Sequence, residues 1–382
     1  MIIICTIAKV LPIAAFYKHE CGVTVNALAE LVTDRSTSVR LACCQMLSFL
    51  VNCLPDRYEH HQMLLPYLLN FFHDDIDEIR SCANSAIESC GEQYEVENPN
   101  DIIERRQYQV DGNEKCNHVD ALPFPFTRRP RLGARLFVRN NSKRFFSALL
   151  DELTCWVSKT RLQSAKLLST LIVFNEEHIT MDCHNTILGI VKAVQSSLKE
   201  HEKESKPLLT IFEQILELMG RFIEPQTYSK LLLPRVTGDI DSATTFLEGG
   251  AHSESSCIAN SVALASMIRG TLPKTLLPYS FNLINTLSLS LSQSYFKGVN
   301  VKIQWLNILV TIFDRLKGES FAGAQSACFN VTGRIHSSEE MIKKCKASVI
   351  TLMNNGLNGE EELVCATAQQ LLNQISNIDL KV

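Results

Sequence analysis

The chain has 382 residues, of which 46% are hydrophobic and 20% are charged, and its formal net charge is −4. This is the composition of an ordinary globular protein, and the slightly acidic balance argues against nucleic acid as a general partner. A single compact domain rarely reaches this length, so we expect either two domains or one elongated array of repeats.

The first twenty residues, MIIICTIAKVLPIAAFYKHE, are mostly apolar. A secretory signal peptide carries a basic segment before its apolar core. No such segment precedes this apolar run, and Lys9 interrupts it. We therefore expect a buried helix here rather than a signal sequence.

Two segments forty residues apart share one pattern. Asp34 corresponds to Asp74 and Arg40 to Arg80, with large apolar residues before each Asp and small or apolar residues after each Arg. An Asp side chain can accept hydrogen bonds from the unpaired amides that open a helix, and the Arg can reach an Asp of its own or the neighbouring unit. The pattern predicts two stacked helical hairpins over residues 24–90, with each Asp at the start of a second helix.

Residues 92–142 interrupt this pattern with a long polar connection that is rich first in acids and then in proline and arginine. A connection of this length is either functional or disordered. Its basic part contains Arg128, Arg129, Arg131, Arg135 and Arg139. We interpret these candidate partner-binding residues in two ways. They form a docking surface for an acidic partner segment, or they bind carboxylates at helix ends within the chain.

The rest of the chain shows helical periodicity. Residues 144–174 keep Arg161 at the repeat position but lack the Asp six residues before it. Residues 275–296 carry no charge, yet their apolar side chains recur on one face, which predicts a packed helix rather than a membrane span. A second insertion is expected at 237–256. The predicted domains are residues 1–91, 92–142, 143–236, 237–256 and 257–382.

Motifs for catalysis and for cofactor or metal binding are missing. There is no P-loop, nucleophile elbow, zincin motif or dinucleotide-binding glycine motif. The fourteen cysteines include no Cys-x-x-Cys pair, so we expect buried free thiols in a reducing compartment. The adjacent pair His60 and His61 is predicted to be solvated in a turn between repeats. We expect no catalytic residue, no cofactor and no metal.

The forty-residue period, with its Asp, its Val/Ile-Arg pair and the small residues that follow, is similar to the HEAT-repeat pattern. The predicted fold is therefore all-α, an α-solenoid (superhelix) of antiparallel helix pairs of the HEAT or armadillo type. Its expected structural ladder consists of Asp34, Arg40, Asp74, Arg80 and Arg161.

Several longer stretches, among them RRPRLGARLFVRNNSKRFF, ELTCWV, TRLQSAKLL and the IRG of LASMIRGTLPKTLLPY, resemble the HEAT-repeat axonemal dynein assembly factor family. The resemblance implies a non-enzymatic cytoplasmic scaffold that helps to assemble inner and outer dynein arms of motile cilia. Its implied partners are axonemal dynein intermediate or heavy chains, chaperones and other assembly factors. No nucleic acid, membrane or small-molecule substrate is expected, and the chain looks shortened at its N-terminus. A HEAT adaptor of another class, such as a nuclear transport receptor or a phosphatase scaffold, is the alternative.

Overall fold

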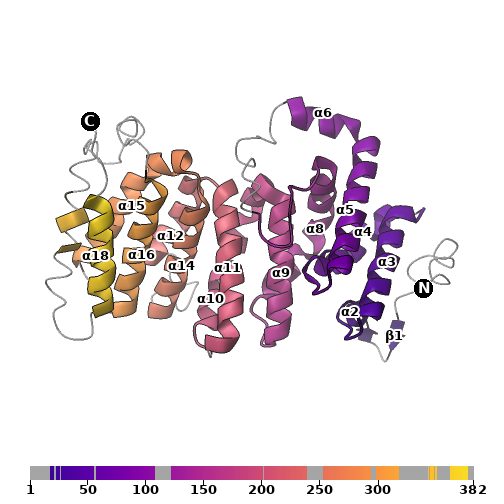
Figure 1. Cartoon of the computed structure of the whole chain (residues 1–382), viewed down its shortest axis with the longest axis horizontal. Coiled ribbons are helices and arrows are strands. Elements are labelled where there is room, and N and C mark those ends of the chain that lie inside the picture. The colour runs from indigo at the N-terminus through magenta and orange to yellow at the C-terminus, as the bar shows by residue number, and fades with distance from the viewer. Residues whose placement is uncertain are drawn as a thin grey trace. The chain divides into compact units, whose positions relative to one another are not determined.

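The computed structural model describes residues 18–20, 23–25, 27–55, 57–107, 122–200, 202–238, 253–293, 298–317, 343, 345–347, 349–350 and 362–376. The chain divides into two compact units, Met1–His178 and Ile179–Val382. Figure 1 shows the helices of each unit lying side by side.

Among the described residues, the first unit contains a small hairpin and three helix pairs, with α6 between the second and the third. Its elements are β1 (Lys18–Glu20), β2 (Val23–Val25), α2 (Ala27–Val32), α3 (Thr37–Cys53), α4 (Arg57–Asn70), the 3₁₀ helix η2 (Phe71–His73), α5 (Asp77–Glu97), α6 (Pro99–Gln107), α8 (Leu132–Glu152) and α9 (Ser158–Asn175). The 3₁₀ helix η4 (Glu176–Asp182) follows α9. The predicted hairpins over residues 24–90 are confirmed, since α2 pairs with α3, and α4 with η2 pairs with α5.

The predicted all-α array of helix pairs is confirmed, and a small β-hairpin precedes it. Lys18 pairs with Val25 and Glu20 with Val23 in antiparallel register. Strands of three residues are too short to show alternating hydrophobicity, which is why the sequence pattern did not reveal them. The helix expected over the first twenty residues is wrong at Lys18–Glu20, and residues 1–17 lie outside the described part of the chain.

The connection between helices predicted at 92–142 is shorter in the structure. Residues 92–97 continue α5, and residues 132–142 already belong to α8. Between them, α6 packs through the buried Ile102 against Leu132 and Leu136. Residues 108–121 lie outside the described residues.

The second unit is built from further helix pairs. Its elements are α10 (Cys183–Ser197), α11 (Glu202–Phe222), α12 (Pro225–Thr237), α14 (Glu254–Gly270), α15 (Pro273–Gln293), α16 (Val299–Arg315) and α18 (Glu362–Ser376). Helix α14 packs against α10, α11, α12 and α16, so most of its residues are buried. Of the insertion expected at 237–256, Thr237 ends α12 and residues 254–256 open α14, while 239–252 lie outside the described residues.

The uncharged stretch at 275–296 falls largely in α15. Leu283, Ile284, Leu287 and Leu291 are buried, so the prediction of a packed helix is confirmed. The separation into an apolar and a polar face is incomplete, because Ser288 is buried and Leu289 is exposed. None of the helices in the described residues has both the length and the apolar character needed to cross a membrane.

Two helix crossings depend on glycines that bring backbones together. At the crossing of α5 and α8, a Cβ on Gly91 would lie within 3.0 Å of the Ala134 backbone, and one on Gly133 would meet the Gly91 carbonyl. At the crossing of α11 and α14, Gly220 faces the Met267 carbonyl and Gly270 the Glu217 carbonyl in the same way. Backbone atoms cannot rotate aside as a side chain can, so these positions require glycine.

Candidate functional site

The first two helix pairs are joined by an ion pair of the predicted Asp–Arg ladder. Arg40, on α3, donates from Nε to Asp74 Oδ2 at 2.7 Å and from Nη2 to Asp74 Oδ1 at 3.1 Å. Asp34 and Asp74 each accept from an amide two residues on, Ser36 N at 2.7 Å and Ile76 N at 3.0 Å. The Arg thus reaches the Asp of the neighbouring unit, as one of the two predicted arrangements requires.

Asp74 is held ionised by its neighbours. Burial acts to raise the pKa of this carboxyl, but the hydrogen bonds from Arg40 and Ile76, with the charges of Arg40 and Arg80, outweigh burial and lower the pKa below its usual value. Its side chain is only 6% exposed. The pair is therefore a bidentate contact shielded from solvent, a stronger kind of contact than a surface ion pair.

The ladder does not continue into the third helix pair. Cys155 stands six residues before Arg161, where Asp34 and Asp74 stand before Arg40 and Arg80. Arg80 instead donates to the Asp74 carbonyl and to Asp77 Oδ1, 3.0 Å away, and its guanidinium lies 5.2 Å from the centre of the Phe124 ring. Arg161 is buried and donates to Ser158 Oγ at 3.3 Å.

Residues 122–131, here called the strap, lie alongside α5. On that side Arg131 binds the carboxylates of Glu92 and Glu95, and its backbone amide donates to Glu88 Oε1 at 3.3 Å. The exposed Arg128 lies 3.9 Å from Glu88. The strap is thus attached to α5 by polar contacts along that helix.

The other side of the strap contacts the end of α9. The Phe126 ring lies 5.4 Å from the Phe72 ring and 5.7 Å from the Phe174 ring, and Phe72 and Phe174 are themselves 5.9 Å apart. Aromatic rings packed at these distances and angles attract one another through their quadrupoles as well as by burial. Phe126 therefore joins the second helix pair to the third.

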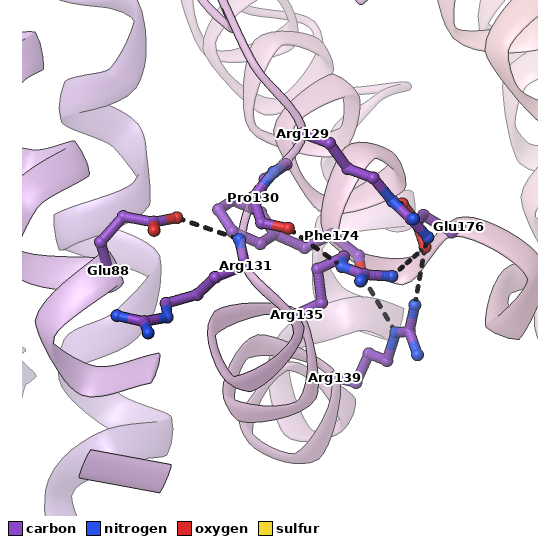
Figure 2. A network of polar contacts seen from close by, with 8 residues as sticks. All are labelled: Glu88, Arg129, Pro130, Arg131, Arg135, Arg139, Phe174 and Glu176. Atoms are coloured by element: carbon purple, nitrogen blue, oxygen red, sulfur yellow. Dashed lines mark hydrogen bonds and ion pairs between the residues drawn. The ribbon is translucent and has the colours of Figure 1, made fainter. Parts of the chain in front are cut away.

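Three arginines converge on one buried glutamate next to this aromatic cluster (Figure 2). Arg129 binds Glu176 through two bonds of 2.7 and 2.9 Å, Arg135 through one of 2.5 Å and Arg139 through one of 3.2 Å. Arg135 Nε also donates to the Pro130 carbonyl, and Arg139 Nε to the Phe174 carbonyl. Figure 2 shows the side chain of Arg131 pointing the other way, toward α5, with its backbone amide bonded to Glu88.

These contacts correct the docking-surface interpretation of the five arginines. Arg135 and Arg139 are 4% and 6% exposed, and Arg129 and Arg131 are engaged with carboxylates of the same chain. A guanidinium that is buried in such a contact is not available to an acidic partner. The other interpretation, binding of carboxylates within the chain, describes these four residues. Arg128, with 74% of its side chain exposed, is the exception.

Among the described residues, the aromatic side chains of Tyr58, Phe124 and Trp156 are more than half exposed, and the repeat pattern identifies none of them. Trp156, in the turn between α8 and α9, is 90% exposed, and Phe124 on the strap is 68% exposed. For Trp156 the sequence did hold an indication, because this residue belongs to ELTCWV, one of the stretches that resemble the assembly factor family. Large exposed aromatic residues are enriched where proteins bind one another.

The predicted solvated turn at His60 and His61 is wrong, because α4 already begins at Arg57. His61 is buried, its Nε2 lies 2.9 Å from the Val51 carbonyl, and its ring packs against Phe137. Burial lowers its pKa. This histidine is a core residue.

The cysteines that the structure describes are free thiols. Burial raises the pKa of Cys43 and of Cys257 to about 11 and that of Cys90 to about 12. Such thiols carry little thiolate near neutral pH and react slowly. Within the described residues, no three His, Cys, Asp or Glu side chains are grouped so that they could hold a metal ion.

Two family models match the chain. The model described as "Dynein axonemal assembly factor 5, HEAT-repeat domain" matches residues 122–339, and one described as "Dynein axonemal assembly factor 5-like, TPR repeats" matches residues 1–105. The second description differs from the HEAT prediction for the N-terminal pairs. The forty-residue spacing of Asp34 and Asp74 is longer than the 34 residues usual for a TPR. The repeat type and the domain boundaries remain predictions there.

Curated relatives carry the same name. Dynein axonemal assembly factor 5 of Xenopus laevis is 28% identical over 357 residues, which are 92% of this chain and 39% of that protein. The human protein is 29% identical over 55% of this chain and 23% of its own length, and the Drosophila melanogaster protein is 23% identical over 52% and 22%. The chain thus spans about two fifths or less of the length of these relatives.

A solved structure titled as an engineered protein covers 91% of this chain and 88% of its own at 12% identity and a TM-score of 0.27, a similarity too low to bear on function. The HEAT-repeat family model, by contrast, spans more than half of the chain and begins at the strap that joins α5 to α9. This chain therefore belongs to the dynein axonemal assembly factor 5 family.

Proposed function

We propose that this chain is a non-catalytic scaffold that helps to assemble axonemal dynein arms in the cytoplasm before they enter motile cilia. Family membership is the observation that carries the proposal, because the relatives are named as assembly factors for axonemal dynein. Stacked helix pairs support it, since such arrays present long surfaces to other proteins.

Axonemal dynein intermediate or heavy chains are the proposed clients, for both inner and outer arms. Chaperones and other assembly factors are proposed as further binding partners. No observation favours the alternatives, a nuclear transport receptor or a phosphatase scaffold.

The proposed contact residues in the first unit are Arg128, Phe124 and Trp156. Each is mostly exposed, whereas the other arginines of the predicted docking surface are engaged within the chain. An aromatic side chain supplies a large apolar contact at little entropic cost, and an exposed guanidinium can pair with a partner carboxylate. Arg128 and Phe124 lie on the strap, whereas Trp156 lies in the turn at the other end of α8, so they are two separate contact points. They replace the five-arginine surface expected from the sequence.

Affinity purification of the tagged chain from ciliating cells tests the proposal. We expect dynein heavy or intermediate chains to be recovered with it, and recovery to fall several-fold in Trp156→Ala and in Arg128→Glu. Val96→Ala is the matched control, since Val96 lies in the same unit, is apolar and is 81% exposed. Melting midpoints equal to the wild type would show that the fold is intact in all three variants. Recovery of importin cargo or phosphatase subunits in place of dynein chains would refute the assembly role.

A further inference from the structure

The strap is held in place by its side chains rather than by regular backbone hydrogen bonds. Its residues belong to no helix or strand, and within it Phe126 N donates to the Pro123 carbonyl at 3.0 Å. The helices on either side carry their own ladders of backbone bonds and their own buried apolar faces. Loss of the strap's side-chain contacts would therefore release the strap before it unfolded the helices.

The attachment on the α9 side centres on Glu176, which has an unusual backbone. It has φ 48° and ψ −125°, a left-handed conformation that favours glycine. Such a conformation is strained and persists where its surroundings hold it. Its carboxylate, with a side chain 6% exposed, receives the three arginines described above. The strained backbone and the arginine contacts occur at one residue, directly after the end of α9.

We propose that Glu176 is a latch that closes the strap over Phe72 and Phe174. In the closed state, seen here, Phe126 covers these two rings and Arg129 ties the strap to the end of α9. In the open state the strap leaves α9, and the two rings become accessible while the helices stay folded. The latch concerns the structure of the first unit and does not depend on the proposed role in dynein assembly.

The three arginines come from different elements and make different contacts around Glu176. Arg129 is the strap residue among them, whereas Arg135 and Arg139 lie on α8. Arg135 and Arg139 also bind the Pro130 and Phe174 carbonyls, so they keep α8 against both the strap and α9. Replacing Arg129 therefore removes one attachment of the strap, while replacing Glu176 removes the common partner of all three.

Limited trypsin digestion of the intact chain tests the latch. Trypsin cuts after arginine unless proline follows, so Arg128 and Arg131 are the sites within the strap. A protease needs a displaced segment, so cutting reports how often the strap leaves its place. We expect Glu176→Gln to be cut at these sites about tenfold faster or more, and Arg129→Met at the same sites with a smaller increase.

Glu92→Gln is the matched control, because Glu92 binds Arg131 on the α5 side of the strap and is 66% exposed. We expect cutting in that variant to stay within about twofold of the wild type, since a surface pair contributes little. Circular dichroism should show unchanged helicity in all three variants. Wild-type cutting rates in both Glu176→Gln and Arg129→Met would overturn the proposal. So would cutting of Glu176→Gln throughout its helices with loss of helicity, since Glu176 would then be a core residue and no latch.

Discussion

At the scale of single residues, two buried carboxylates connect elements that are distant in the sequence. Asp74 receives Arg40 from the preceding helix pair, and Glu176 receives arginines from the strap and from α8. Charge-assisted bonds of this kind are stronger than neutral ones, and breaking one partner of a buried pair leaves a charge without its counter-ion. The contribution of each arginine therefore depends on the burial of its carboxylate.

A comparison of two double-mutant cycles tests this dependence. We expect a coupling free energy of about 1–3 kcal/mol between Arg40 and Asp74, from Arg40→Met and Asp74→Asn. For Arg80 and Asp77 we expect less than about 0.5 kcal/mol, because the Asp77 side chain is 91% exposed. Urea denaturation of the single and double variants measures both values. Equal couplings would contradict the ranking by burial.

His73 makes the stability of the first unit depend on pH. Its Nε2 lies 3.0 Å from Thr170 Oγ1, and burial, helped by the charge of Lys166, lowers its pKa from 6.5 to about 4. The folded state thus keeps the ring neutral where the unfolded chain takes up a proton. The unfolding free energy therefore keeps its full value, as far as His73 is concerned, above about pH 6.5. It falls as the pH drops from 6.5 toward 4, because the unfolded chain binds a proton that the folded state does not.

His73→Gln should remove that part of the pH dependence. We expect the wild type to lose about 1–2 kcal/mol more unfolding free energy than the variant between pH 7 and pH 5. Glutamine keeps a group that can hydrogen-bond to Thr170, so a general loss of structure is not expected. Parallel pH profiles for the two proteins would show that His73 titrates alike in the folded and unfolded states.

Sequence patterns predicted the residues whose roles are local or periodic. Asp34 and Asp74 lie three residues before the second helices of their pairs, where each accepts from an amide two residues on, and the forty-residue period places Arg40 within reach of the next Asp. Arg135 and Arg139 could not be assigned this way, because their partner Glu176 directly follows α9 and does not stand at an Asp position of the repeat. The polar neighbours of His61 indicate a turn, whereas α4 begins at Arg57 and includes this residue.

At the scale of elements, the paired glycines determine how closely helices cross. Gly270 lies against the Glu217 carbonyl, and Gly298, which precedes α16, lies against the Glu254 carboxylate. A carboxylate at the end of a side chain can rotate away, whereas a backbone carbonyl inside a helix cannot. Gly270 belongs to the IRG stretch that resembles the family. That α11 approaches it too closely for a side chain is visible only in the packed helices.

We therefore expect Gly270→Ala to destabilise the second unit by about 1–3 kcal/mol or more, as overpacked sites do. Gly298→Ala is the matched control and should cost less than about 1 kcal/mol, because the Glu254 side chain can move. Chemical denaturation followed by tryptophan fluorescence measures both. A smaller loss in Gly270→Ala than in Gly298→Ala would mean that α11 and α14 can separate at little cost.

At the scale of the whole chain, the division into two compact units raises the question of whether they unfold together. The chain has two tryptophans, one in each unit. Trp156 in the first unit is 90% exposed, whereas Trp305 in the second is 1% exposed and donates from its indole to the Val236 carbonyl at 3.2 Å. Unfolding changes the surroundings of Trp305 greatly and those of Trp156 little.

The two signals of a denaturation experiment should therefore report different parts of the chain. We expect the red shift of tryptophan emission to follow the second unit and the loss of helical circular dichroism to follow both, so that the two curves do not coincide. Trp305→Phe should abolish most of the red shift, while Trp156→Phe should leave it intact. Gly270→Ala, which lies in the second unit, should move the fluorescence midpoint more than the dichroism midpoint. Coincident curves in the wild type, moved equally by Gly270→Ala, would instead show that both units unfold in one cooperative step.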